Sequence, residues 1–197
     1  MIGVFGGTFD PPHVGHLILA DEARAVLSLS TVLWVVTGIP PHKPAQPVSP
    51  VTHRLGMVER SIQGNPGFEI SRIELDRPGP HFAAETLELL ASAHPNQEWV
   101  YVMGEDSLVD LPNWHRPADF VQLCRSIVVL RRSQVEADLD QLEREIPGLT
   151  AKVRLLAVPL VDVSARDIRR RVQTGQPFRY LVPASVAEYI RQHRLYV

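Results

Sequence analysis

The sequence predicts an α/β fold, a doubly wound parallel sheet with helices on both faces. Three observations lead to this class. Short β-branched runs alternate with helical patterns along the chain, as in strand–helix–strand units. Most of those runs are continuously apolar, which is typical of strands buried on both faces. The chain has 197 residues, of which 45% are hydrophobic and 21% charged, so it can bury one core of ordinary domain size.

The expected strands are the β-branched runs at residues 2–5, 31–37, 69–75, 99–103, 126–130 and 153–158. The helical patterns between them cover residues 16–27, 51–63, 82–93, 117–123 and 135–146. The first of these has apolar residues at helical spacing, namely Leu17, Ala20, Ala23 and Leu27. A parallel sheet of this kind has right-handed crossovers and binds ligands at the carboxyl ends of its strands.

Two further features complete the expected organisation. Residues 164–173 and 183–193 are predicted as helices with no strand between them, and Pro183 suits the first turn of the second helix. Residues 38–50 contain five prolines and are predicted as a long loop that leaves the second strand. No linker or repeat divides the chain, so residues 1–197 are expected to form one domain, with a helical C-terminal part from about residue 164 to 197.

Composition excludes several classes of protein. Lys+Arg 20 and Asp+Glu 22 give a net charge of −2, which does not favour a nucleic-acid polymer or an anionic membrane as partner. Cys124 is the only cysteine, so neither an intrachain disulfide nor a Cys-x-x-Cys metal site is expected. The first residues do not resemble a signal peptide, and apolar runs such as 32–36 are too short to span a bilayer. We therefore expect a cytoplasmic protein.

The segment GGTFDPPHVGH, residues 6–16, carries the strongest chemical signal. Gly6 and Gly7 follow the first strand and let the backbone approach a ligand closely. His13 and His16 are three residues apart at a helix N-terminus, where imidazole and backbone N–H groups favour a phosphate. The dinucleotide pattern GxGxxG and the pattern GxxxxGK[ST] are both absent. The alternative is that the histidines only cap the helix and the glycines only form a turn.

GGTFDPPHVGHL resembles the signature of the HxGH nucleotidyltransferase superfamily, in the form found in bacterial nicotinate-mononucleotide adenylyltransferases. The resemblance continues in order from Gly6 to Tyr196. It implies a dinucleotide-fold-like nucleotidyltransferase that joins nicotinate mononucleotide to the AMP of ATP, giving deamido-NAD and pyrophosphate in NAD biosynthesis. It also implies that Mg²⁺ arrives with ATP, and no carboxylate cluster suggests a metal site built by the protein alone.

The resemblance implies a set of phosphate-binding residues. His13 and His16 are expected to hold triphosphate oxygens, with His16 stabilising charge at the α-phosphate, and Lys43 of the PHK element and Arg169 are expected to hold the β- and γ-phosphates. The ATP site implied in this way comprises Gly6, Gly7, Thr8, Phe9, His13, His16, Gly104, Asp106, Ser164 and Arg169. Asp106 is alternatively a helix cap, and Lys43 alternatively a solvated surface residue.

The segment VSARDIR, residues 163–169, resembles the family motif ISSTxIR. Ala165 and Arg166 replace a serine and a threonine, so a hydroxyl contact with phosphate is lost unless the charge of Arg166 substitutes for it. Arg170 and Arg171 are expected on the solvated face of the helix. Arg54, in a segment that resembles the next family helix, is expected to form a structural ion pair.

The acceptor site implied by the resemblance comprises Phe82, Ala83, Thr86, Trp114 and Arg131. The segment PHFAAETL, residues 80–87, resembles the family loop PSYTxDTL, whose backbone N–H groups select a carboxylate; those donors survive the changes of side chain. Trp114, in a segment that resembles GxDxLxxLxxW, is expected to stack on the pyridine ring; the alternative is a half-buried core residue. Arg132 replaces the family's proline, which leaves open whether it or Arg131 faces the site.

Four other functions can be weighed against the pattern. Phosphopantetheine adenylyltransferases share the first loop, but the GEDSL segment and Trp114 argue against them, and the RTxGIS string of cytidylyltransferases is absent. A nicotinamide-mononucleotide adenylyltransferase differs only in acceptor choice. A nucleotide-sensing module would bind without turnover and would not need donors at a leaving group. Homo-oligomerisation is left open.

Overall fold

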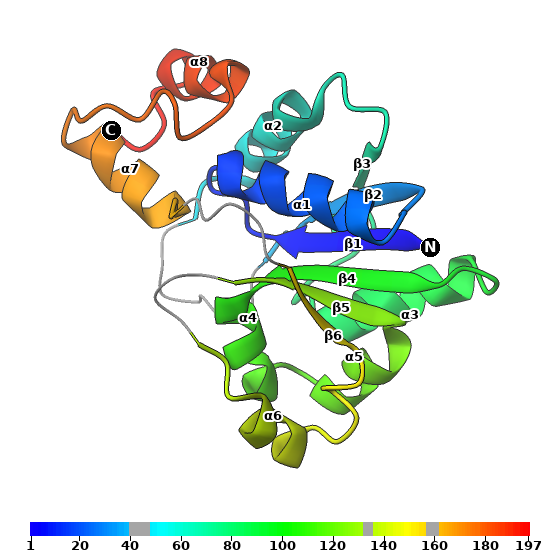
Figure 1. Ribbon diagram of the computed structural model, residues 1–197. Helices are drawn as coiled ribbons and strands as arrows, with labels where there is room; N and C mark the ends of the chain where they lie inside the picture. Colours follow the sequence, from blue (N-terminus) through cyan, green and yellow to red (C-terminus); the bar gives the residue numbers. More distant parts are fainter. Residues whose placement is uncertain (40–47, 132–135, 157–161) are drawn as a thin grey trace.

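The computed structural model describes residues 1–39, 48–131, 136–156 and 162–197. Its described strands form one parallel sheet in the order β3-β2-β1-β4-β5-β6 (Figure 1). The strands are β1 Ile2–Gly7, β2 Thr31–Val36, β3 Phe68–Ser71, β4 Trp99–Gly104, β5 Ser126–Leu130 and β6 Val153–Leu156. The strand order reverses between β1 and β4, which is where a doubly wound sheet opens a crevice. The predicted fold class is confirmed.

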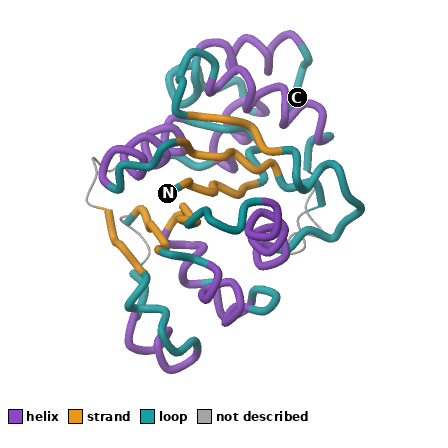
Figure 2. Tube along the Cα trace, turned by 90° about the vertical axis from the view of Figure 1, so that its right-hand side faces the viewer, coloured by secondary structure: helices purple, strands orange, loops and turns teal. Residues whose placement is uncertain are grey.

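Helices cover both faces of this sheet (Figure 2). They are α1 Val14–Val26, α2 Val51–Ile62, α3 Ala83–Ala93, α4 Glu105–Val109, the 3₁₀ turn η1 Leu111–Asn113, α5 Pro117–Leu123, α6 Leu139–Glu145, α7 Ala165–Gln173 and α8 Ala184–Gln192. Neighbouring strand residues point to opposite faces, so Val4 packs in the core under α3 and α5 whereas Phe5 packs under α1 and α2. A third apolar cluster joins α7 and α8 to Met57 of α2.

Several boundaries differ from the sequence predictions, most of all at β3 and α6. β3 ends at Ser71 instead of residue 75, because the N–H groups of Leu75 and Asp76 turn back to the carbonyl of Arg72. α6 begins at Leu139, where the side chain of Asp138 caps the N–H of Gln141 at 2.9 Å. The short α4 and η1 were not predicted, since five and three residues are too few to show a helical period. Most of the proline-rich loop, residues 40–47, and the end of the sixth predicted strand lie outside the described residues.

A buried guanidinium holds the segments that follow β1 and β2. The side chain of Arg54 is 1% exposed. Its Nη1 donates to the carbonyls of Thr8 and Thr37 at 2.9 and 2.6 Å. Its Nε and Nη2 donate to the carbonyls of Ser49 and Gly38, both at 2.9 Å. The expected ion pair is therefore corrected: Arg54 is structural, but its hydrogen-bond partners are backbone carbonyls of the β1–α1 and β2–α2 connections, which the fork geometry of a guanidinium can reach together.

Arg54→Met is expected to lower the free energy of unfolding by about 3 kcal/mol, because it leaves several buried carbonyl groups without donors. The matched control is Arg72→Met, since Arg72 forms only an exposed pair with Asp76 at 3.4 Å. The control should change stability by less than about 0.5 kcal/mol. Chemical denaturation followed by circular dichroism measures both values, and equal losses would contradict the assignment of Arg54.

Candidate active site

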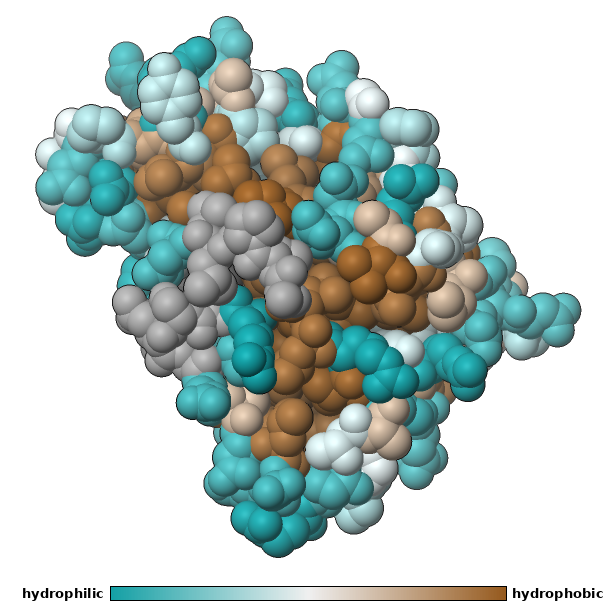
Figure 3. Space-filling model, viewed as in Figure 1, coloured by the Kyte–Doolittle hydropathy of each residue, from teal (hydrophilic) through white to brown (hydrophobic). Residues whose placement is uncertain are grey.

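A cavity of about 580 Å³ lies at the carboxyl ends of β1 and β4, within the range of small-ligand sites. Most of its wall comes from five parts of the chain: residues 5–19, the turn around Glu74, the start of α3, the segment from Tyr101 to His115, and the start of α7. Thr37, Val48 and Leu130 complete the lining. The view in Figure 3 shows hydrophobic residues gathered in the middle of this side of the molecule and hydrophilic residues around them. The lining of the cavity is likewise mixed, with aromatic rings beside imidazole, carboxyl and guanidinium groups.

His13 and His16 lie together at the first turn of α1 and both line the cavity. Their rings stack with centroids 3.6 Å apart, and the backbone N–H of His13 donates to Nδ1 of His16 at 3.1 Å. Because Nδ1 of His16 accepts this bond, the proton of a neutral ring is on Nε2, which can then donate to a ligand. Phe9 holds the His16 ring edge-on at 5.1 Å. The structure thus brings the two predicted histidines to one helix N-terminus.

The packing of neighbouring side chains requires glycine at positions 6 and 7, in addition to any requirement set by a ligand. A Cβ atom at Gly6 would lie 2.5 Å from the hydroxyl of Tyr101, and one at Gly7 would lie 2.9 Å from the Phe9 ring. Thr8 and Phe9, the other predicted residues of this loop, also line the cavity. The two glycines therefore leave room inside the protein for the Tyr101 hydroxyl and the Phe9 ring, which approach the backbone of β1 closely.

The arginines of α7 divide between two faces. Asp167 pairs with Arg170 and Arg171, the latter at 2.6 Å, which holds those two side chains on the outer face. Arg169 instead lines the cavity and donates from Nη1 to the carbonyl of Asp10 at 2.7 Å. Arg166, three residues earlier, lines the cavity on the same face. Ser164 also lines it and caps α7 by accepting from the N–H of Asp167 at 3.1 Å.

Asp10 joins the first loop to distant parts of the chain. Its Oδ2 accepts from the N–H of Ser49 at 3.0 Å, and its Oδ1 accepts from the hydroxyl of Tyr196 at 2.6 Å. Burial and the neighbouring Asp10 carboxylate raise the pKa of the Tyr196 hydroxyl, which keeps it a donor. This contact joins the C-terminus to the site.

The start of α3 forms the opposite wall, where Phe82 and Ala83 line the cavity. The N–H groups of a first helical turn have no partner within the helix and favour an anion. Trp114 is half-buried beside them, edge-on to Phe120 at 5.3 Å, and His115 lies against the Phe82 ring at 4.3 Å.

Thr86 and Arg131 are not brought to the cavity wall. Thr86 is buried in the next turn of α3, where its hydroxyl donates to Glu74 at 2.8 Å, and Arg131 is exposed after β5. Gly104 and Asp106, in contrast, line the cavity as predicted. Lys43 and Arg132 lie outside the described residues.

Glu74 is a buried carboxyl group at the cavity that no sequence signal indicated. Burial raises its pKa, and the hydrogen bond from Thr86 only partly offsets this effect.

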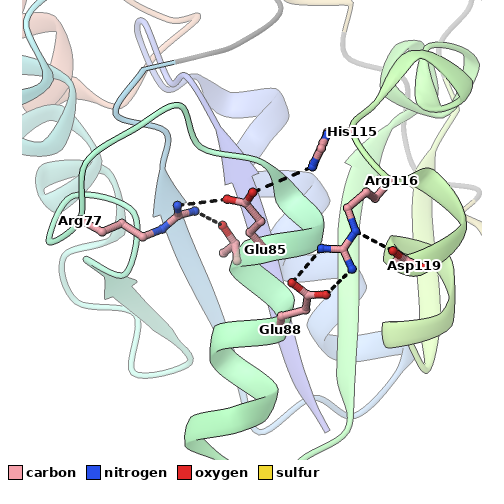
Figure 4. Close-up of polar contacts among 7 residues, drawn as sticks. Arg77, Glu85, Glu88, His115, Arg116 and Asp119 are labelled. Carbon is pink, nitrogen blue, oxygen red and sulfur yellow. Dashed lines mark hydrogen bonds and ion pairs between the residues drawn. The ribbon is translucent and has the colours of Figure 1, made fainter.

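Ion pairs lie on the outer side of α3, as Figure 4 shows. Arg77 pairs with Glu85 at 3.2 Å. Arg116, in the segment before α5, pairs with Glu88 at 2.7 Å and with Asp119 at 2.6 Å. These pairs fix the orientation of the α3 N-terminus toward the cavity.

The described residues contain no group of three or more His, Cys, Asp or Glu side chains arranged to hold a metal ion. Among the same residues, no helix is long and apolar enough to cross a membrane.

Comparison with known proteins identifies the family. Residues 4–171 match the family described as cytidylyltransferase-like. A relative from Thermomicrobium roseum named "Probable nicotinate-nucleotide adenylyltransferase" is 46% identical over 99% of this chain and 91% of its own. A relative of the same name from Dehalococcoides mccartyi is 44% identical over 98% of this chain and 96% of its own.

Solved structures agree with the fold. The Plasmodium falciparum nicotinic acid mononucleotide adenylyltransferase complexed with NaAD superimposes with a TM-score of 0.83 at 17% identity, covering 99% of this chain and 96% of the other. The same enzyme complexed with APC gives a TM-score of 0.79 at 16% identity over the same shares of the two chains. The full-length relatives, the motifs in order and the cavity at the sheet edge together show that this chain belongs to the nicotinate-nucleotide adenylyltransferase family of cytidylyltransferase-like nucleotidyltransferases.

Proposed function

We propose that this protein joins nicotinate mononucleotide to the AMP of ATP, forming deamido-NAD and pyrophosphate in NAD biosynthesis. The observation that carries the proposal is one cavity with two unlike walls. One wall presents His13, His16 and Arg169 and suits a triphosphate, and the other presents the N-terminus of α3 beside Trp114 and suits a negatively charged aromatic ring. The family membership agrees with this reaction.

The chemistry is a substitution at the α-phosphorus of ATP. A phosphate oxygen of the mononucleotide forms the new P–O bond as the bond from the α-phosphorus to the bridging oxygen breaks, and the electron pair leaves with pyrophosphate. No covalent intermediate with the protein is needed, so the protein contributes positioning and charge stabilisation. Nε2 of His16 is the donor assigned to the charge that develops at the α-phosphate.

ATP is expected to bind as its magnesium complex. Magnesium prefers phosphate and water oxygens with few protein ligands, and Asp10 at the cavity already accepts from Ser49 and Tyr196. We therefore propose that magnesium enters the site as part of the ATP substrate. We also propose that residues 1–197 form one domain that acts in the cytoplasm. Its partners then include neither a nucleic-acid polymer nor a membrane.

His16→Ala is expected to lower kcat by about a hundredfold, the usual effect of removing one transition-state donor. The Kd for ATP should change by less than about threefold, because the ground-state complex keeps its other contacts. Steady-state kinetics and equilibrium titration with a non-reacting ATP analogue measure the two quantities. Equal losses in binding and turnover would mean that His16 contributes only a ground-state contact.

Arg169→Ala is expected to weaken ATP binding by about tenfold, because it removes a charge-assisted contact with the triphosphate. Arg170→Ala is the matched control, since Arg170 pairs with Asp167 on the outer face of α7. Lys43→Ala is predicted to act like Arg169→Ala. Titration that showed the same loss for Arg169→Ala and Arg170→Ala would contradict the assignment of one binding face.

Nicotinate mononucleotide is expected to be a better acceptor than nicotinamide mononucleotide by at least about tenfold in kcat/KM. Backbone N–H groups at the start of α3 satisfy a carboxylate, whereas a carboxamide brings its own N–H group against them. Trp114→Ala should raise KM for the acceptor by removing the stacking surface. A pyrophosphate-release assay with both mononucleotides and phosphopantetheine tests the choice. Equal values, or a preference for another acceptor, would reject the nicotinate assignment.

The raised pKa of Glu74 predicts that acceptor binding depends on pH. Its neutral carboxyl is compatible with an anionic ring, and ionisation as the pH rises through that pKa adds a negative charge to the same cavity. KM for nicotinate mononucleotide should rise severalfold with pH in the wild type and stay flat in Glu74→Gln. Nicotinamide mononucleotide, with an uncharged substituent, is the control acceptor. Superimposable pH profiles of the two proteins would contradict the effect.

A further inference from the structure

His81 is a buried histidine whose two ring nitrogens both bond to backbone. It is 5% exposed, lines the cavity and immediately precedes Phe82 and Ala83. Its Nδ1 accepts from the N–H of Ile39, in the segment that follows β2, at 3.2 Å. Its Nε2 lies 3.2 Å from the carbonyl of Arg77, in the segment that follows β3. One side chain therefore joins two backbone segments to the start of α3.

These partners fix the protonation state of the ring. A backbone N–H can only donate, so Nδ1 must carry a lone pair, and a carbonyl can only accept, so Nε2 must carry the proton. The two partners thus match the Nε2–H tautomer of His81. A doubly protonated ring would place its Nδ1–H against the N–H of Ile39 and lose that bond.

The surrounding backbone is shaped for the imidazole. A Cβ atom at Gly38 would lie 2.8 Å from Cε1 of His81, and one at Gly79 would lie 2.9 Å from the same atom. The ring therefore sits between two glycines that approach it closely.

We propose that His81 is a positioning residue for the acceptor: it anchors Phe82 and Ala83 so that the N–H groups at the start of α3 select the carboxylate of the mononucleotide. This inference rests on the proposed function. Other contacts of this segment run through side chains, because the Thr86 hydroxyl donates to Glu74 at 2.8 Å and Arg77 pairs with Glu85 at 3.2 Å. His81, in contrast, bonds directly to the backbone of Ile39. Loss of the bridge should loosen acceptor binding and leave the histidines of α1 in place.

Three variants separate the two hydrogen bonds. His81→Asn places an amide oxygen near the position of Nδ1 and keeps the bond from the N–H of Ile39. His81→Gln can donate from its side-chain amide to the carbonyl of Arg77. His81→Ala loses both hydrogen bonds. His94→Asn is the matched control, because His94 is exposed at the other end of α3. For each protein we would measure the Kd of nicotinate mononucleotide by calorimetry, kcat, KM for ATP, the nicotinate-to-nicotinamide ratio of kcat/KM, and Tm.

His81→Ala is expected to raise the Kd of nicotinate mononucleotide about tenfold, as loss of these hydrogen bonds implies, and to lower the nicotinate-to-nicotinamide ratio. His81→Asn and His81→Gln should recover part of both losses, while kcat and KM for ATP change by less than about threefold. The control should match the wild type. A lower Tm with unchanged Kd and ratio would assign His81 to stability alone and overturn the proposal.

Failure of the proposed function is distinguishable from failure of this inference. If the wild type binds nicotinate mononucleotide but does not convert it, the proposed reaction is wrong. The Kd values of the His81 variants would then still test whether His81 positions the acceptor. A wild type that does not bind it would overturn both. Nitrogen-15 spectra of histidine-labelled protein give a readout independent of activity: His81 should show an unprotonated Nδ1 and a protonated Nε2, and any other state would contradict the bridge.

Discussion

The site depends on polar contacts buried beneath it, at Arg54 and Asp10. The guanidinium of Arg54 binds carbonyl oxygens of the segment after β1 and of the connection between β2 and α2. The Asp10 carboxylate accepts from Ser49 and from Tyr196 at the C-terminus, and its carbonyl accepts from Arg169 of α7. These hydrogen bonds act together with the apolar cluster of α7 and α8, against which Val14 of α1 packs, to bring α1 and α7 to one cavity. Burial lowers the pKa of Arg54, and the charge of Asp10 opposes this effect, which links the two groups electrostatically.

Helix N-termini then surround the cavity, namely those of α1, α3 and α7 and that of the short α4. α1, α3 and α7 all begin at its wall, because each follows a segment that leaves the carboxyl edge of the sheet. The first and third bring imidazole and guanidinium groups, which suit a triphosphate, and the second brings aromatic rings, which suit a flat acceptor. The same topology thus places both substrates of the proposed transfer side by side, and the acid Glu74 is compatible with that arrangement while its carboxyl remains neutral.

Much of this structure could be predicted from the sequence. Short β-branched runs, most of them continuously apolar, marked all six strands of the described sheet. The spacing of His13 and His16 and the motif around Arg169 placed these residues where the structure has them. Contacts between distant segments could not be predicted. Glu74 was hidden in an apparent strand that ends early, and the bonds of Arg54, His81 and Tyr196 depend on carbonyl, N–H and carboxylate partners brought together only by the tertiary fold. Thr86 matched a motif, but its hydroxyl bonds to Glu74 instead of facing the cavity.

The most direct test of the account is a crystal structure with a non-reacting ATP analogue and nicotinate mononucleotide bound together. We expect the triphosphate to lie between the N-termini of α1 and α7, against His16 and Arg169. The pyridine carboxylate should lie at the first turn of α3, with its ring stacked on Trp114. The phosphate oxygen of the mononucleotide should lie opposite the leaving pyrophosphate, about 3–3.5 Å from the α-phosphorus. A triphosphate bound away from α7, or an acceptor ring bound away from α3, would contradict the central claim that one cavity assembles both substrates for adenylyl transfer.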